Sequence, residues 1–109
     1  MTTTNSKGNE KKPRLDIDKL IHEPARLMIL ANLYVVESAD FIFLMRQTGL
    51  TQGNLSSHMS KLEDAGYIEI KKEFISKRPH TLVLLTDGGR TAFRKYMQSI
   101  KQVFNGLTE

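Results

Sequence analysis

Apolar residues recur along the chain at spacings that change from helical to strand-like and back. Residues 24–36 are apolar on nearly every face, which predicts a helix at the centre of a core. Pro24 suits the first position of this helix, because the N–H that proline lacks would have no partner there. Upstream, the apolar residues that follow Asp16 predict a short helical turn. The core is therefore expected to form around one central helix.

Two further helices are predicted before the periodicity changes. The first runs from about Phe41 to Gln47 and ends at Gly49, a residue suited to left-handed backbone. The second follows Thr51, a candidate N-cap, and extends through Ala65. Its apolar residues recur at helical spacing and predict an inward stripe, made of Leu55, Met59 and Leu62.

The next segment alternates apolar and polar residues, as a half-buried strand does. Residues 67–74 predict one strand, and residues 80–85 predict a strand that returns beside it. The basic connection, residues 75–79, contains neither Gly nor Asn, so no turn type is predicted for it.

A last helix is predicted over residues 87–105, capped by Thr86 and Asp87. Its apolar residues follow a heptad-like spacing. This stripe continues beyond the part that a small core would cover, and consists of Phe93, Tyr96, Met97, Ile100, Phe104 and Leu107.

Length and composition are those of one small globular domain. The chain has 109 residues, of which 39% are hydrophobic, enough for a single core. Cysteine is absent, which excludes disulfides, thiolate metal sites and cysteine nucleophiles. The three histidines, His22, His58 and His80, include no pair at ligand spacing. We therefore expect neither a metal nor another cofactor.

No membrane segment or export signal is expected. The longest apolar runs fall far short of the roughly 20 residues that a membrane helix needs. Residues 1–14 contain no apolar stretch that could serve as the core of a signal peptide. We expect a cytoplasmic protein without a membrane partner.

Positive charge is unevenly distributed. The formal net charge is +4, and the isoelectric point is about 9.5. Residues 1–14 carry four Lys or Arg against one Glu and predict a disordered basic tail before a domain over residues 15–109. Residues 67–86 and 87–109 each carry four basic residues against two acidic ones. This bias permits a nucleic-acid partner, the alternative being an ordinary solvated surface.

The predicted order of elements suggests a use for these charges. A helix, a short turn, a polar helix and a basic hairpin follow one another as in a winged helix-turn-helix, whose second helix enters the major groove. Short polar side chains at the start of that helix suit base edges: Gln52, Asn54, Ser56 and Ser57. Cations along the helix and hairpin suit phosphates: Lys61, Lys71, Lys72, Lys77 and Arg78.

Three stretches make a family resemblance explicit. They are HEPARLMILANL, ADFIFLMRQTGLTQGNLSSHMSKLEDAGYIEI and KRPHTLVLLTDGGRTAF, which together span roughly residues 20–97. They resemble winged-helix regulators of the ArsR and MarR type, most closely the compact stand-alone winged-helix DNA-binding branch. The DNA-facing residues that this resemblance implies are Thr51, Gln52, Asn54, Ser56, Ser57, His58, Lys61, Lys77 and Arg78.

The resemblance implies an α+β fold, with a two-stranded wing, a C-terminal dimerisation helix and the order helix, helix, helix, helix, strand, strand, helix. It also implies a prokaryotic homodimer that binds double-stranded DNA. We expect a sequence-specific transcriptional regulator that represses from a near-palindromic operator. The expected dimer interface is Phe93, Tyr96, Met97, Ile100 and Phe104. The alternative is a protein-interaction module without DNA specificity, because fold does not determine function.

Some residues allow two interpretations. Ile42 and Phe43 are apolar where similar sequences more often carry Ala and Glu, so they are buried against a partner or the N-terminal turn, or they line a ligand pocket. A small-molecule inducer has no other support in the sequence. His58 either contacts DNA or packs beside the apolar stripe of its own helix.

The sequence contains no support for an enzyme. Ser57 and His58 are not a nucleophile and base, because neighbours on a helix point about 100° apart. Gly88 and Gly89 are not followed by the Lys-Ser/Thr pair of a phosphate-binding loop.

Overall fold

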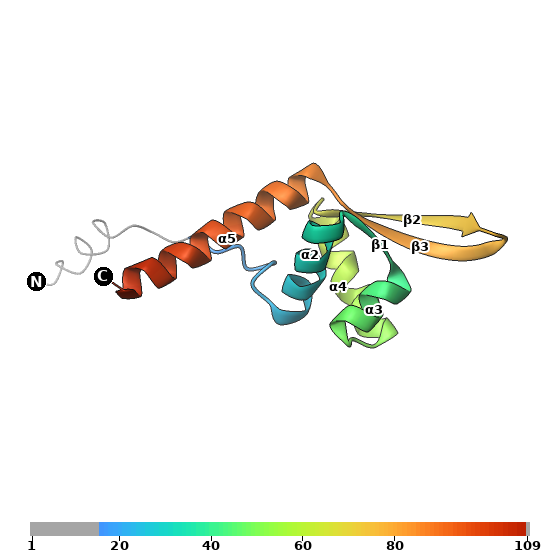
Figure 1. The fold of residues 1–109 in the computed structure, drawn as a ribbon, viewed down its shortest axis with the longest axis horizontal. Helices are drawn as coiled ribbons and strands as arrows, with labels where there is room; N and C mark the ends of the chain where they lie inside the picture. Colours follow the sequence, from blue (N-terminus) through green and yellow to red (C-terminus); the bar gives the residue numbers. More distant parts are fainter. Residues whose placement is uncertain (1–15, 109) are drawn as a thin grey trace, which may run out of the picture.

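The computed structural model describes residues 16–108 and arranges them as four helices and a three-stranded sheet (Figure 1). The predicted basic tail, residues 1–14, lies outside the described residues. The elements in chain order are α2 (Pro24–Val36), β1 (Ser38–Asp40), α3 (Phe41–Thr48), α4 (Gln52–Asp64), β2 (Ile68–Ile75), β3 (Arg78–Leu85) and α5 (Asp87–Thr108). The α+β winged helix-turn-helix predicted from the sequence is confirmed.

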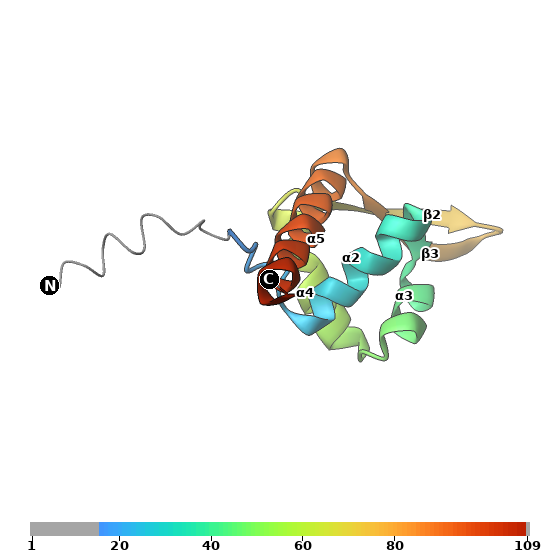
Figure 2. The same cartoon turned by 60° about the vertical axis from the view of Figure 1, so that its left-hand side comes forward.

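Helix α2 is the centre of the core, as its apolar sequence predicts. Ile29, Leu30 and Leu33 have no exposed surface at all. The helix contacts α3, α4, α5 and two strands, and Figure 2 shows it running between α5 and the helix-turn-helix. A helix that is apolar nearly all round must be covered on several sides. The other elements are positioned by covering it.

Helices α3 and α4 begin and end within a residue or two of their predicted bounds, because local signals determine their ends. The Asp40 side chain accepts a hydrogen bond from the backbone N–H of Ile42 at 2.7 Å. Gly49 ends α3 with left-handed backbone, at φ 71°. Thr51 then caps α4 by accepting from the backbone N–H of Asn54 at 3.2 Å. The turn between the two helices is therefore short and well defined.

The predicted order of elements was wrong at two points. The segment after Asp16 forms only a hydrogen-bonded turn, in which the N–H of His22 donates to the carbonyl oxygen of Asp18 at 2.8 Å. Strand β1 was not predicted, and it pairs antiparallel with β3, so that the sheet order is β1-β3-β2. A strand of three residues has no alternation to detect, and it exists here because β3 offers a free edge.

The wing is longer and its turn tighter than predicted. Strands β2 and β3 pair in register from Ile68↔Leu85 to Ile75↔Arg78, which leaves only two residues for the turn. Both, Ser76 and Lys77, have positive φ, 52° and 65°, as a type I′ turn requires. The predicted five-residue connection was therefore wrong, because cross-strand pairing extends into it from both strands and leaves only Ser76 and Lys77 unpaired. The ribbon projects well beyond the helices (Figure 1).

The start of α5 is fastened to the loop before the wing. Thr86 accepts a hydrogen bond from the N–H of Gly89 at 2.9 Å and donates one to the carbonyl oxygen of Gly66 at 2.6 Å. Gly89 is buried so tightly that a Cβ atom there would overlap the carbonyl oxygen of Tyr67. The third residue of α5 must therefore be one without a side chain.

The segment before α2 is also held by specific bonds. The Tyr67 hydroxyl donates to Asp18 at 2.5 Å, and this bond, together with burial, raises the pKa of Tyr67 to about 12. The Nδ1 atom of His22 lies 2.8 Å from the hydroxyl oxygen of Tyr96 on α5. The segment before α2 is therefore held against both the loop that precedes β2 and helix α5.

We expect Gly89→Ala to destabilise the fold, by about 1–3 kcal/mol or more, because the added methyl group overlaps backbone that cannot move aside. The matched control is Gly88→Ala, whose Cβ would meet its nearest neighbour at an ordinary 3.5 Å. That control should be neutral or stabilising by about 0.5–1 kcal/mol, since alanine is the better helix former. Urea unfolding of both variants tests the contact, and equal midpoints would contradict it.

Candidate nucleic-acid interface

Helix α4 buries one stripe and presents the rest of its surface to solvent. The predicted stripe is confirmed, with Leu55, Met59 and Leu62 almost wholly buried. Because 3.6 residues make one turn, burying this stripe leaves the opposite side of the helix exposed. The residues of this helix that were predicted to contact DNA are exposed, except His58: Gln52, Asn54, Ser56, Ser57 and Lys61. Ser60 is exposed as well. Thr51 is exposed as well, although its hydroxyl is used to cap the helix.

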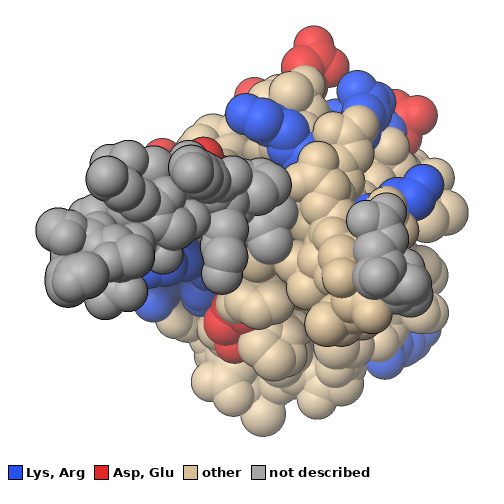
Figure 3. Space-filling view, turned by 90° about the vertical axis from the view of Figure 1, so that its left-hand side faces the viewer, with Lys and Arg blue, Asp and Glu red and all other residues tan. Residues whose placement is uncertain are grey.

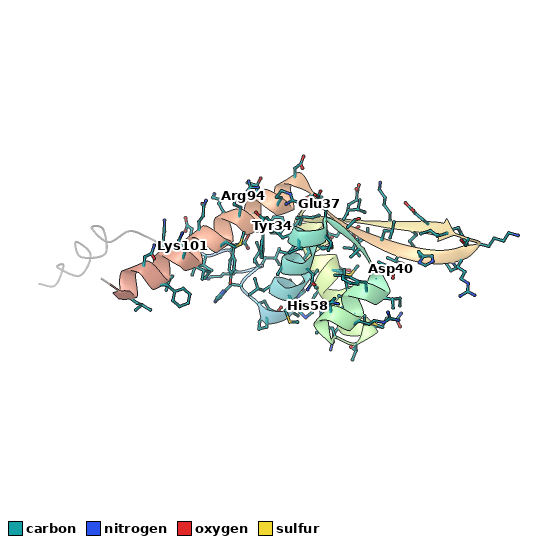
Figure 4. The ribbon with its side chains drawn as sticks, in the orientation of Figure 1. Tyr34, Glu37, Asp40, His58, Arg94 and Lys101 are labelled. Atoms are coloured by element: carbon teal, nitrogen blue, oxygen red, sulfur yellow. The ribbon has the colours of Figure 1, made fainter. Side chains whose placement is uncertain are left out.

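His58 is directed toward its own chain. Its Nδ1 atom lies 3.1 Å from Nη1 of Arg26 and 3.8 Å from Oε1 of Glu23, both at the start of α2. Figure 4 labels His58 among the helices of the domain. The Glu23 carboxylate also accepts from the backbone N–H of Arg26, and this hydrogen bond lowers the pKa of Glu23. Of the two interpretations of His58, an intramolecular contact is therefore present, while a contact with DNA stays a prediction.

The wing brings one of its cations, Lys72, beside α4 and carries two others at its far end. Lys77 lies in the turn and Arg78 begins β3, and both are exposed. A hollow of about 310 Å³ separates α4 from the ribbon. Polar residues of both elements line it: Gln52, Ser56 and Ser60 from α4, and Lys72 and Thr81 from the wing. Groups suited to bases and groups suited to phosphate thus lie around one concave surface.

A second hollow, of about 590 Å³, lies between α3 and the wing. Ile42 and Phe43 line it and are 47% and 39% exposed, so within the described residues neither is buried against the N-terminal turn. Arg46 and Arg78 give its rim positive charge, and His80 lies beside them.

An ion pair at this rim joins α3 to the wing, and the sequence did not predict it. Nδ1 of His80 lies 2.9 Å from Oδ2 of Asp40, the residue that also caps α3. The hydrogen bond from His80 holds the pKa of Asp40 below its ordinary value. No sequence signal could have indicated the pair, because its members are forty positions apart.

Neither a metal site nor a membrane-spanning helix occurs among the described residues. No group of three or more His, Cys, Asp or Glu side chains is arranged to hold a metal ion in the part of the chain that the structure describes. None of the helices described is long and apolar enough to cross a membrane.

A helix-turn-helix whose second helix exposes polar side chains next to a basic two-stranded ribbon defines a winged-helix DNA-binding protein. The chain belongs to the family described as the winged helix DNA-binding domain, whose model matches residues 25–104. It is 40% identical over 89 residues to the uncharacterized protein MJ0432 of Methanocaldococcus jannaschii, an alignment that covers 82% of this chain and 97% of that relative.

Solved structures agree with this assignment. A transcriptional regulator homologue protein from Pyrococcus horikoshii OT3 is 32% identical, with a TM-score of 0.78 over 95% of this chain and 97% of that one. A MarR-family transcriptional regulator from Silicibacter pomeroyi shares the fold at 20% identity, with a TM-score of 0.62 over 84% of this chain and 60% of that one. The resemblance found in the sequence is confirmed: the chain is a winged-helix DNA-binding protein and is similar to a transcriptional regulator homologue.

We expect the ion pair between Asp40 and His80 to make stability depend on acid pH. The pKa of Asp40 is lowered on folding, so its contribution is complete above the unfolded value of 3.8 and is lost as pH falls through the lower folded value. Asn can still cap α3 through its single side-chain oxygen, so Asp40→Asn removes the charge and the carboxylate oxygen that His80 contacts while it keeps the cap. At pH 6 this variant should be less stable by up to about 1 kcal/mol, the range of partly exposed pairs.

Urea unfolding at pH 6 and at pH 2.5 measures this difference, which should narrow at the lower pH. Glu69→Gln is the control, because Glu69 is an exposed carboxylate of β2 without an ion pair among the described residues. A difference for Asp40→Asn that stays constant with pH would contradict the assignment.

Proposed function

We propose that the protein is a homodimeric repressor that occludes a promoter by binding a near-palindromic operator. The observation that carries this proposal is the concave surface between α4 and the wing, where Gln52 and Ser56 lie opposite Lys72. The start of α4 would enter the major groove, where glutamine or asparagine can pair with adenine through two hydrogen bonds. The wing cations would then lie along the flanking phosphates. A regulator of this kind acts on chromosomal DNA, so we place it in the cytoplasm.

The dimer part of the proposal rests on α5, whose apolar stripe divides into two halves. Phe93 and Tyr96 are only 5% and 6% exposed and belong to the core of a single chain, so they contribute little surface to a partner. Beyond them Met97, Phe104 and Leu107 are 38%, 61% and 76% exposed. Ile100, which lies between Met97 and Phe104 in the chain, is half-buried.

A second copy of α5 would cover the exposed half of the stripe. This half lies at the end of the molecule opposite the wing (Figure 1), and in the view toward that end the Lys and Arg side chains form separate groups with uncharged surface between them (Figure 3). Pairing of the two helices around a two-fold axis would present two α4 helices to successive major grooves, about 34 Å apart.

Selection of bound sequences from a random pool of duplex DNA tests the function itself. An enriched palindrome with half-sites one helical turn apart supports a dimeric regulator that recognises an operator. No enrichment, with no binding even at low salt, would favour the protein-interaction module instead.

We expect Gln52 and Arg78 to have separable roles on DNA. Gln52→Ala should cost about 1–3 kcal/mol on the preferred site and reduce discrimination there, because the substitution removes a bond to a base. Arg78→Ala should weaken binding to all sequences alike and make the salt dependence shallower by about one unit for each phosphate that is no longer neutralised, or two per dimer. The test is to measure the affinity of both variants for the preferred site and for a scrambled site over a range of salt concentrations. The opposite assignment of effects would contradict the proposed roles of helix and wing.

We expect Phe104→Glu to dissociate the dimer while each chain stays folded. Phe104 is 61% exposed in a single chain, so the carboxylate is costly only where a partner would bury it. Gln102→Glu adds the same charge two positions away, on the opposite side of the helix, and should leave the dimer intact. Sedimentation equilibrium at micromolar concentration, with circular dichroism as the check on folding, measures the outcome. A dimer unchanged by Phe104→Glu would show that this stripe is not the interface.

A further inference from the structure

The far end of the wing carries a large aromatic side chain that nothing in the described chain covers. Phe74, next to the end of β2, is 79% exposed. Its cross-strand partner Pro79 is exposed too. Phenylalanine is among the residues most often buried, and a single one at the tip of a projecting ribbon leaves a large apolar area in water.

Alternation along β2 determines the direction in which Phe74 points. Successive side chains of a strand lie on opposite faces, so Ile68, Ile70, Lys72 and Phe74 share one face of the ribbon. Ile70 and Lys72 line the hollow beside α4. Phe74 therefore stands about 7 Å beyond Lys72 along the strand, on the side of the wing that faces the proposed DNA.

The surroundings of Phe74 indicate what it would contact. Residues 71–78 include four cations, Lys71, Lys72, Lys77 and Arg78, against the single acid Glu73. A membrane or protein surface could accept an apolar tip, but this density of positive charge complements a polyanion. The two-residue turn at Ser76 and Lys77 keeps the end of the ribbon narrow. The tip carries Phe74 on one face and Ile75 on the other, so it can present a single apolar side chain to a minor groove, which is about 6 Å wide.

We propose that Phe74 is an apolar wedge, which enters the minor groove next to the major groove occupied by α4 and presses against a base-pair step. Wedges of this type partly unstack the step and bend the duplex toward the major groove. The inference rests on the proposed function and adds to it a contact that does not depend on charge. Phosphate contacts weaken as salt rises, whereas burial of Phe74 contributes the same factor at every salt concentration.

The test uses the full-length protein and a duplex that carries its selected operator, with 2-aminopurine in the flanking minor-groove segment. Phe74→Ala should weaken binding about ten- to a hundredfold at every salt concentration, with an unchanged salt slope. It should also abolish the rise in 2-aminopurine fluorescence that reports unstacking. Phe74→Leu should retain most of both effects, because leucine can also act as a wedge.

Ile75→Ala is the matched control. It removes an apolar side chain at the same height of the ribbon but on the opposite face, where Ile75 is 45% exposed, and it should leave the fluorescence signal intact. If Phe74→Ala also makes the salt slope shallower, the wing no longer reaches its phosphates and the wedge is overturned. Unchanged affinity and fluorescence for Phe74→Ala would overturn the wedge alone, provided that Gln52→Ala still reduces discrimination. A wild-type protein that binds no duplex would overturn both the wedge and the proposed function.

Discussion

The structure depends on the burial of α2. Ile29, Leu30 and Leu33 have no exposed surface, and the helix that carries them contacts three other helices and two strands. Because so many sides of one helix are apolar, α3, α4, α5 and the sheet can each be stabilised by covering a different side of it. The angle between the exposed face of α4 and the wing, which determines how a duplex could be approached, is thus set by packing around this helix.

Polar contacts then fix the positions of α5, α3 and the wing relative to one another, which packing alone would leave variable. Thr86 and the close approach of Gly89 to Tyr67 fix the start of α5 against the loop that leads into β2. The ion pair between Asp40 and His80 joins the start of α3 to β3. The first of these contacts holds the base of the ribbon and the second holds β3 partway along, whereas residues 71–79 are exposed throughout. The wing is therefore anchored at one end and accessible at the other.

Part of the apolar surface that remains exposed lies at the two ends of the molecule, in addition to Val35 on α2 and Ile42 on α3. Phe74 stands at the tip of the wing, and Phe104 and Leu107 lie on the last turns of α5, at the opposite end of the molecule (Figure 1). In the proposed complex, their separation would allow one end to meet DNA while the other meets a second chain, so that neither contact would block the other.

Local signals in the sequence were sufficient for the helices and for the polar face of α4. Pro24, Gly49 and Thr51 act on the residues immediately beside them, and the stripe from Leu55 to Leu62 is a property of one helix. The family resemblance lies in the same segments, and the residues of α4 that were predicted to contact DNA are exposed, except His58.

What only the tertiary structure decided involves residues far apart in the chain. Strand β1 exists because β3 is there to pair with it. Pairing between β2 and β3 extends the wing and forces positive φ on Ser76 and Lys77. The sequence did not predict this turn, because it contains neither Gly nor Asn. Packing against the core also divides the stripe of α5, placing Phe93 inside the chain and leaving Phe104 outside. Periodicity shows that a side of a helix is apolar, but only the arrangement of its neighbours determines which part of that side they cover.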